Sequence, residues 1–423
     1  MPQDIHHHTF DNGLTLLAER MPHVRSAAIN FLIPSGYVYD PPEYLGMASV
    51  LSDWITRGAG DRDNRALVQA LDDLGLDRSE SVGAFHMRFW GATLATNLQQ
   101  ALELYADILR RPKLPSEELD AVKALALQEI QSIEDDPRQK AFIELRKRHY
   151  PHPLGRDRRG LVDTINILTP QIVRQHYENR FQPKGAILSL AGNIEWEPLV
   201  ELVGKLFGDW APGESTEVER REPDGGIHHL KKDTKQTQIA IAYPSVPFGH
   251  EDYYNAHGAV QVLSGGMSGR LFTKVREERG LCYAVSASYQ TFRHVGAVLC
   301  YAGTTNDRAQ ETLNVTLQEL QNLQKGVEED EVERVKAGVK SALIMQEEST
   351  SARAGALAAD WYYLERVRKL EEIQAAIDAL TPDSIVAYAK KYPAKDVTLV
   401  TLGPEPLKMP SGGVFGWIKD VLT

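Results

Sequence analysis

The chain has 423 residues, of which 42% are hydrophobic and 25% charged, as in an ordinary globular protein. This length exceeds what one hydrophobic core organises and fits two domains of about 200 residues each. The formal net charge of −11 argues against a nucleic-acid partner and against binding to an anionic membrane surface.

The N-terminal residues and the two cysteines bear on the cellular compartment. The first residues lack a charged start followed by an apolar stretch, so we expect no signal peptide, and no run of 18 apolar residues predicts a membrane span. Cys282 and Cys300 lie in strand-like runs and cannot form a disulfide framework, which favours reduced, buried thiols. We therefore expect a cytoplasmic protein. Its apolar tail, residues 410–423, is expected to pack on its own chain, with contact to a partner or disorder as the alternatives.

The first half opens with strands. The turn Asp11-Asn-Gly13 precedes strand-like runs over Leu14–Ala18 and Ala27–Ile33. A helical period follows over Tyr44–Thr56, and the next residues, Arg57-Gly58, supply a helix stop.

Two long amphipathic patterns follow, over Leu94–Arg110 and Ser116–Glu134, and both predict helices. Glutamates stand in the first turn of the second helix, where the helix dipole favours negative charge. The residues Asp135-Asp136-Pro137 end it.

The second half repeats the first at an offset of about 212 residues. Gly46-Met-Ala-Ser-Val-Leu51 corresponds to Gly258-Ala-Val-Gln-Val-Leu263, and Leu168-Thr-Pro170 corresponds to Leu380-Thr-Pro382. Since chance matches do not keep one offset over a whole domain, the sequence predicts a duplicated fold.

The boundaries follow from composition. Residues 213–226 are polar and rich in turn formers, which is typical of a linker. We therefore predict half-domains at 1–212 and 227–423. The fold class is α+β: two homologous half-domains, each a mostly antiparallel sheet with helices packed on one face, together forming half of a clam-like chamber.

The densest motif lies in the second half. It reads Leu263-Ser-Gly-Gly-Met-Ser-Gly-Arg-Leu-Phe-Thr-Lys-Val-Arg-Glu-Glu-Arg-Gly-Leu-Cys-Tyr-Ala-Val285. It resembles the C-terminal domain of the pitrilysin/insulinase family of zinc metallopeptidases, in the mitochondrial-processing-peptidase subgroup. The resemblance covers essentially the whole chain, since that family is itself built from two related α+β halves.

The resemblance implies roles for two residues of this motif. In the family, an arginine and a tyrosine seven positions later reach the substrate peptide and its scissile carbonyl; here they are Arg276 and Tyr283. The loop residues Gly265, Gly266 and Met267 are implied to contact substrate. Judged outside the motif, Arg276 would be a solvated helix residue and Tyr283 a half-buried strand residue.

The family's zinc motif, His-x-x-Glu-His on the first helix, is replaced here. Ser49 and Asp53 stand at the histidine positions and Ser52 at the glutamate position, so we expect no catalytic zinc in this chain. Glu129 stands at the place of the distant third ligand and is interpreted as a remnant. The segment 79–85 likewise lacks the Asn-Ala pair of the family's substrate-pairing strand.

Other histidines do not make a convincing metal site. His6, His7 and His8 are consecutive, as are His228 and His229, and adjacent side chains of a strand point to opposite faces.

The resemblance implies a two-chain enzyme in which a homologous subunit carries the zinc motif and this chain contributes Arg276 and Tyr283. The partner is expected to be that subunit or, in a homodimer, a second copy. The substrate would be a peptide or an unfolded segment. The alternative is a catalytically inactive scaffold or peptide-binding dimer, which would resemble the core subunits of the respiratory bc complex.

Overall fold

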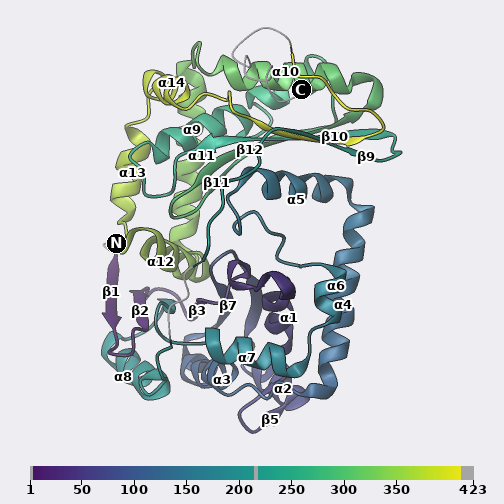
Figure 1. The fold of residues 1–423 in the computed structure, drawn as a ribbon. Coiled ribbons are helices and arrows are strands. Elements are labelled where there is room, and N and C mark those ends of the chain that lie inside the picture. The colour runs from purple at the N-terminus through teal and green to yellow at the C-terminus, as the bar shows by residue number, and fades with distance from the viewer. Residues whose placement is uncertain (1–2, 214–217, 411–423) are drawn as a thin grey trace. The chain divides into compact units, whose positions relative to one another are not determined.

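A computed structural model describes residues 3–213 and 218–410 of the chain (Figure 1). They form two compact units. Unit 1 takes the described residues of Met1–Ser132, Arg156–Glu219 and Met345–Val367, and unit 2 takes those of Ile133–Gly155, Arg220–Ile344 and Arg368–Thr423.

Unit 1 is built on a six-stranded sheet in the order β1-β2-β8-β3-β7-β6. All neighbouring strands are antiparallel except β2 and β8, which are parallel. The strands are β1 (Asp4–Thr9), β2 (Thr15–Arg20), β3 (Ser26–Ile33), β6 (Asp77–Val82), β7 (Met87–Leu94) and β8 (Ile187–Gly192). A short hairpin of β4 (Gly58–Ala59) and β5 (Arg62–Asp63) lies apart from this sheet.

Unit 2 repeats this arrangement in a five-stranded sheet of order β11-β12-β10-β13-β9. Its one parallel pair, β9 with β13, corresponds to β2 with β8, and the other neighbours are antiparallel as in unit 1. The strands are β9 (Ile227–Lys231), β10 (Gln236–Ser245), β11 (Ala284–Thr291), β12 (Gly296–Thr305) and β13 (Thr398–Gly403). The duplication predicted from the sequence is therefore present in the topology, and the α+β class with two homologous half-domains is confirmed.

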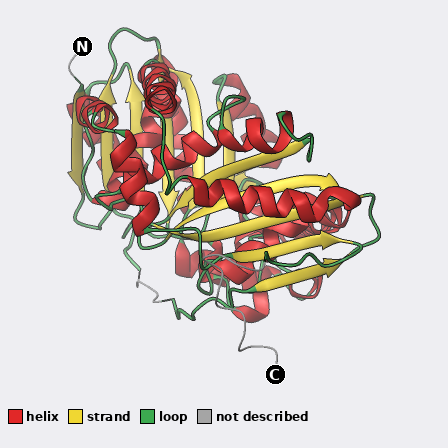
Figure 2. Ribbon diagram, turned by 90° about the horizontal axis from the view of Figure 1, so that it is seen from above, coloured by secondary structure: helices red, strands yellow, loops and turns green. Residues whose placement is uncertain are grey.

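Helices cover the apolar face of each sheet (Figure 2). In unit 1 these are α1 (Met47–Trp54), α2 (Asn64–Asp73), α3 (Leu98–Arg110), α4 (Leu119–Ser132), α6 (Val162–Asn166), α7 (Pro170–Arg180) and α8 (Trp196–Phe207). In unit 2 they are α9 (Tyr253–Ser264), α10 (Ala309–Asn322), α11 (Glu329–Glu347) and α14 (Pro382–Lys391). The apolar cores lie between these helices and the sheets. A further helix, α13 (Leu370–Asp378), precedes α14 in the chain.

The second face of each sheet carries a helix from the other half of the sequence. Helix α12 (Thr350–Leu364) packs on β2, β3 and β8 of unit 1, and α5 (Pro137–His149) packs on β10 and β13 of unit 2. In Figure 1 the blue α5 lies beside the green β10, and the yellow-green α12 lies beside the purple β2 and β3. Helix α5 follows α4 in the first half of the sequence, and α12 follows α11 in the second half. The two halves therefore exchange equivalent helices.

The predicted elements of the first half correspond to real ones with shifted ends. The pattern over Leu94–Arg110 contains the last residue of β7, a 3-10 turn over Ala95–Asn97 and then α3. The Asp135-Asp136-Pro137 break is present: Asp136 caps the next helix, α5, through the Gln139 N–H, and Pro137 is its first residue.

Part of the predicted linker is hydrogen-bonded within unit 2. The His152 N–H donates to the Arg221 carbonyl at 2.8 Å, and the Gly225 N–H donates to the Arg148 carbonyl at 2.9 Å. Most of the apolar tail, residues 411–423, lies outside the described residues, so its predicted packing stays a prediction.

Candidate functional site

Arg276 and Tyr283 lie on either side of a tight connection in unit 2. Arg276 belongs to η6 (Phe272–Glu277), a π-helical segment in which the Glu278 N–H donates to the Thr273 carbonyl at 2.9 Å. Such turns are rare and occur often at functional sites. Gly280, with φ of +58°, then turns the chain, and Tyr283 directly precedes β11.

The Arg276 guanidinium is accessible. Its side chain is 43% exposed, with Cζ 4.7 Å from the centre of the Phe272 ring and Nε 3.9 Å from a Glu277 oxygen. The first contact is a cation–π interaction, and the second is longer than a hydrogen bond. These contacts orient the side chain and leave its fork of N–H donors open to a peptide backbone.

The Tyr283 hydroxyl is also accessible. The residue is 54% exposed, and its hydroxyl donates to Gln236 Oε1 at 3.0 Å. Burial raises the pKa of the neighbouring Cys282 thiol to about 11, and the positive charge of Arg276 partly opposes that shift. The charge of the Arg276 guanidinium is therefore felt at Cys282, the residue before Tyr283, at the same end of β11.

Two polar residues beside Tyr283 were not predicted from the sequence as part of the site. Gln236 is the first residue of β10, and Tyr301 lies on β12, where it is only 2% exposed. The Tyr301 hydroxyl donates to Gln238 Oε1 at 2.5 Å. The alternation Gln236-x-Gln238 predicts two amides on one face of a strand, but only the sheet topology brings them to the tyrosines.

The glycine loop after α9 depends on its glycines. Gly266 has φ of +134°, which side chains rarely adopt, and a methyl on Gly265 would lie 2.5 Å from the Gln261 carbonyl oxygen. Met267 is 76% exposed. The loop is anchored by Arg270, whose guanidinium binds both carboxylate oxygens of Glu331 at 2.7 and 2.5 Å.

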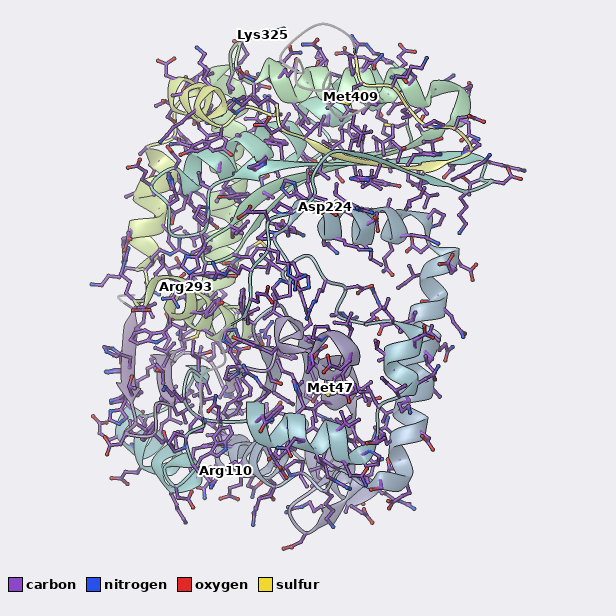
Figure 3. All side chains as sticks on the ribbon, viewed as in Figure 1. Met47, Arg110, Asp224, Arg293, Lys325 and Met409 are labelled. Atoms are coloured by element: carbon purple, nitrogen blue, oxygen red, sulfur yellow. The ribbon has the colours of Figure 1, made fainter. Side chains whose placement is uncertain are left out.

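Helix α1 carries the degenerate zinc motif, and a buried carboxylate caps its start. The two oxygens of Asp40 accept hydrogen bonds from the N–H groups of Gly46 and Ala48 at 2.9 and 3.0 Å. Burial raises the pKa of Asp40 to about 7, against the effect of these two hydrogen bonds. Met47, labelled in Figure 3, is the first residue of the helix and is buried in the core.

Two residues of the degenerate zinc motif form hydrogen bonds with other residues of the chain. The Ser49 hydroxyl donates to the Arg158 carbonyl at 2.7 Å, and Asp53 accepts a hydrogen bond from Arg57 at 3.0 Å. Ser52 is half-buried on the same helix.

Glu129 on α4 is bound by two arginines. Its Oε1 accepts hydrogen bonds from Arg158 Nη2 at 2.6 Å and Arg159 Nε at 3.0 Å. The Glu129 side chain is 43% exposed, and its carboxylate charge is compensated by these two guanidinium groups.

These residues do not fit a zinc ion. Zinc in proteins takes imidazole, thiolate and carboxylate ligands, whereas Ser49 offers a hydroxyl and the Asp53 carboxylate is paired with Arg57. The carboxylate of Glu129 is already paired with two cations, so a metal ion would have to displace them.

The consecutive histidines of β1 behave as strand alternation predicts. His6 stacks on Trp196 of α8 with ring centres 5.1 Å apart, and His7 packs against Trp361 of α12 at 5.0 Å. These helices cover opposite faces of the sheet, so His6 and His7 do not converge on one ion.

Among the described residues, one group of three side chains could converge on a cation: His250, Glu251 and Asp252. The group is partly exposed, and Lys391 lies 2.9 Å from Asp252 and 3.6 Å from Glu251. An internal ammonium therefore already compensates both carboxylates.

A cavity of about 720 Å³ in unit 1 lies between α2, α3 and α8. Its walls carry salt-bridged groups: Arg62 and Arg111 both bind Asp107, and Arg110, labelled in Figure 3, binds Asp209 at 2.8 Å. None of the sequence-predicted site residues lines it.

Within residues 3–213 and 218–410, no helix has the length and apolarity needed to cross a lipid bilayer.

Comparison with known proteins identifies the family. Residues 15–160 match the description "Insulinase (Peptidase family M16)", and residues 168–339 match "Peptidase M16 inactive domain". The chain is 28% identical over 411 residues to "Uncharacterized zinc protease YmxG" of Bacillus subtilis, covering 96% of this chain and 100% of that protein. It is 26% identical to an "Uncharacterized zinc protease" of Rickettsia felis, covering 94% and 97%.

Two solved structures share the fold. A peptidase M16 inactive domain from Pseudomonas fluorescens superposes with a TM-score of 0.88 at 20% identity, covering 96% of this chain and 99% of that one. A protease from Helicobacter pylori superposes with a TM-score of 0.85 at 20% identity, covering 96% and 100%. The two half-domains, the duplicated topology and both family matches lead to one conclusion: the chain belongs to the insulinase (M16) family of peptidases.

Proposed function

We propose that this chain is the subunit without zinc in a two-chain metallopeptidase, and that Arg276 and Tyr283 act on substrate held by both chains. The observation that carries the proposal is a contrast within the molecule. Arg276 and Tyr283 are exposed, with open hydrogen-bonding capacity, whereas Glu129 and Ser49 are engaged by the segment that contains Arg158.

The homologous partner would supply the metal ion and the water that it activates. In this chain, the Tyr283 hydroxyl would donate to the carbonyl oxygen of the scissile bond as that oxygen gains negative charge. Arg276 would bind peptide carbonyl oxygens beside the cleaved bond, because guanidinium donors suit a backbone with several acceptors.

The substrate class that we propose is an extended peptide or an unfolded segment. Strands β6 and β11 are the edge strands at equivalent ends of their sheets, and an edge strand can pair with an added peptide strand. Tyr283 directly precedes β11, so a peptide aligned with that edge would pass the phenol.

A peptidase assay tests the proposal. A quenched fluorescent peptide is incubated with this chain alone, with a homologue that carries His-x-x-Glu-His alone, and with the mixture. Activity in the mixture alone, abolished by a zinc chelator, is expected. Full activity of the homologue alone, unchanged on mixing, would overturn the proposal and favour a scaffold role. Activity of this chain alone would instead show that it needs no zinc-bearing partner.

A further inference from the structure

Two tyrosine hydroxyls face one glycine in unit 2. Gly303 lies on β12, between Gln238 of β10 and Ala284 of β11. A methyl group on its Cα would lie 2.7 Å from the Tyr301 hydroxyl oxygen and 3.1 Å from that of Tyr283. Burial and, after it, the Tyr283 side chain raise the pKa of Tyr301. The missing side chain at position 303 therefore leaves room for both hydroxyls at one point of the sheet.

Each hydroxyl also has an amide acceptor on β10. Tyr301 donates to Gln238, which is 4% exposed, and Tyr283 donates to Gln236, which is exposed at the start of the strand. The hydrogen bond of Tyr301 is thus buried and fixed. That of Tyr283 is open to solvent.

The Tyr301 ring is held from the second face of the sheet. On α5, the Phe142 ring stacks on it at 5.6 Å with an angle of 30°, and Arg138 Cζ lies 4.6 Å from its centre. A fully buried ring with stacking and cation–π contacts has little rotational freedom. Tyr301 can therefore act as an immobile group against which the more exposed Tyr283 side chain is positioned.

In the structure each hydroxyl proton goes to its own glutamine, and both hydroxyl oxygens face Gly303. If Tyr301 turns its proton to the Tyr283 oxygen, the Tyr283 hydroxyl becomes a stronger donor, since hydrogen bonds in a chain polarise one another. The Gln236 amide oxygen has the same chemistry as a peptide carbonyl, and its exposed side chain can rotate away.

Resting on the function proposed above, we infer that Tyr301 and Gly303 are positioning residues for the Tyr283 hydroxyl. Gln236 is the resting acceptor, which a substrate carbonyl replaces. The site thus holds its hydrogen-bond donor in a near-productive orientation before substrate arrives.

Kinetics of the reconstituted two-chain complex test this inference. Tyr301→Phe and Gly303→Ala are expected to lower kcat about tenfold or more with little change in KM, because both disturb the donor and not the peptide-binding contacts. Gln236→Ala is expected to lower KM, because substrate no longer competes with an internal acceptor.

Matched controls exist on the same fold. Tyr289→Phe removes another hydroxyl on β11, one that donates to the Val246 carbonyl at 2.7 Å, and Gly338→Ala adds a methyl where nothing lies within 4 Å. Both are expected to keep wild-type kinetics. Equal losses in Tyr301→Phe and Tyr289→Phe would show a general packing effect and overturn the inference.

A second measurement needs no activity. 3-Fluorotyrosine placed at position 283 reports the surroundings of that ring through its ¹⁹F resonance. The resonance is expected to shift in Tyr301→Phe and Gly303→Ala and to stay unchanged in Tyr289→Phe, with circular dichroism confirming the fold of each variant. An unshifted resonance in both test variants overturns the inference. If Tyr283→Phe keeps full activity, the proposed function fails instead, and the ¹⁹F spectra still decide whether the pairing exists.

Discussion

Arg353 on α12 forms a buried ion pair with Glu19 on β2. Arg353 Nε lies 2.7 Å from Glu19 Oε2, and the two side chains are 4% and 7% exposed. The other oxygen of Glu19 accepts a hydrogen bond from Gln3 at 3.0 Å. This pair joins residues 334 positions apart and binds a helix of the second sequence half to the sheet of unit 1.

We predict that Arg353→Leu lowers the free energy of unfolding by about 3–5 kcal/mol, because it leaves the Glu19 carboxylate buried without its cation. Urea denaturation of the variant and the wild type measures the difference. The double variant Glu19→Leu/Arg353→Leu removes both charges and is expected to recover most of the loss. A double variant that is as unstable as the sum of both single ones would contradict this account.

The exchange of α5 and α12 could not be read from the sequence, and the reason is physical. The faces that these helices cover include polar groups: the Ser189 hydroxyl donates to the Ala354 carbonyl at 2.7 Å in unit 1, and His149 bonds to Thr398 in unit 2. In unit 1 they are interspersed with small apolar clusters, such as the one around Leu357. A helix that packs on such a mixed face needs no strong apolar stripe, so its periodicity is weak. The strands and the duplication were predictable, because buried strands have regular apolar patterns at a constant offset.

The candidate site was predictable only in part. A specific motif marked Arg276 and Tyr283, and the structure brings Arg276 to the end of β11 where Tyr283 lies. Gln236 and Tyr301 had no such signal, since their role depends on which strands are neighbours. The pairing of Glu129 with Arg158 was equally hidden, because the two residues meet only in the folded chain.

We predict that Tyr283→Phe lowers kcat of the two-chain complex about 100- to 1,000-fold, the usual effect of removing one oxyanion donor. Arg276→Ala is expected to act mainly on KM, because the guanidinium binds peptide in the ground state and the transition state alike. Steady-state kinetics with a fluorescent peptide distinguish the two. Arg276→Lys keeps the charge and loses the fork of donors, so a fully active Arg276→Lys complex would contradict the role proposed for the guanidinium.

The engaged state of Glu129 leads to a prediction on metal binding. The triple variant Ser49→His/Ser52→Glu/Asp53→His restores the motif, yet we expect it to bind zinc poorly, because Arg158 and Arg159 still hold the third carboxylate. Adding Arg158→Ala and Arg159→Ala is expected to raise the zinc content, as measured by elemental analysis after dialysis.

The wild-type chain is the control, and it is expected to carry no stoichiometric zinc. Arg158→Ala/Arg159→Ala without the restored motif is also expected to carry none, since hydroxyls do not replace imidazoles. Stoichiometric zinc in the triple variant with both arginines present would show that they do not block the site.

The docking of α5 is predicted to weaken in mild acid. His149 Nδ1 lies 3.0 Å from Thr398 Oγ1 on β13, and burial lowers the pKa of His149 from 6.5 to about 4. Between pH 6.5 and 4 the unfolded chain therefore binds a proton at this residue that the folded chain does not. The contribution of neutral His149 to stability is complete above pH 6.5 and is lost as the pH falls toward 4.

Urea denaturation at pH 7.5, 6 and 5 measures this effect in the wild type and in His149→Gln, which keeps a polar side chain but does not titrate. The stability advantage of the wild type over His149→Gln is expected to shrink from pH 7.5 to pH 5. His294→Gln changes an exposed histidine of the same unit and serves as the matched control. A constant difference between the wild type and His149→Gln at all three pH values would show that His149 is not buried in its neutral form, and that the contact with Thr398 does not hold α5 on the sheet.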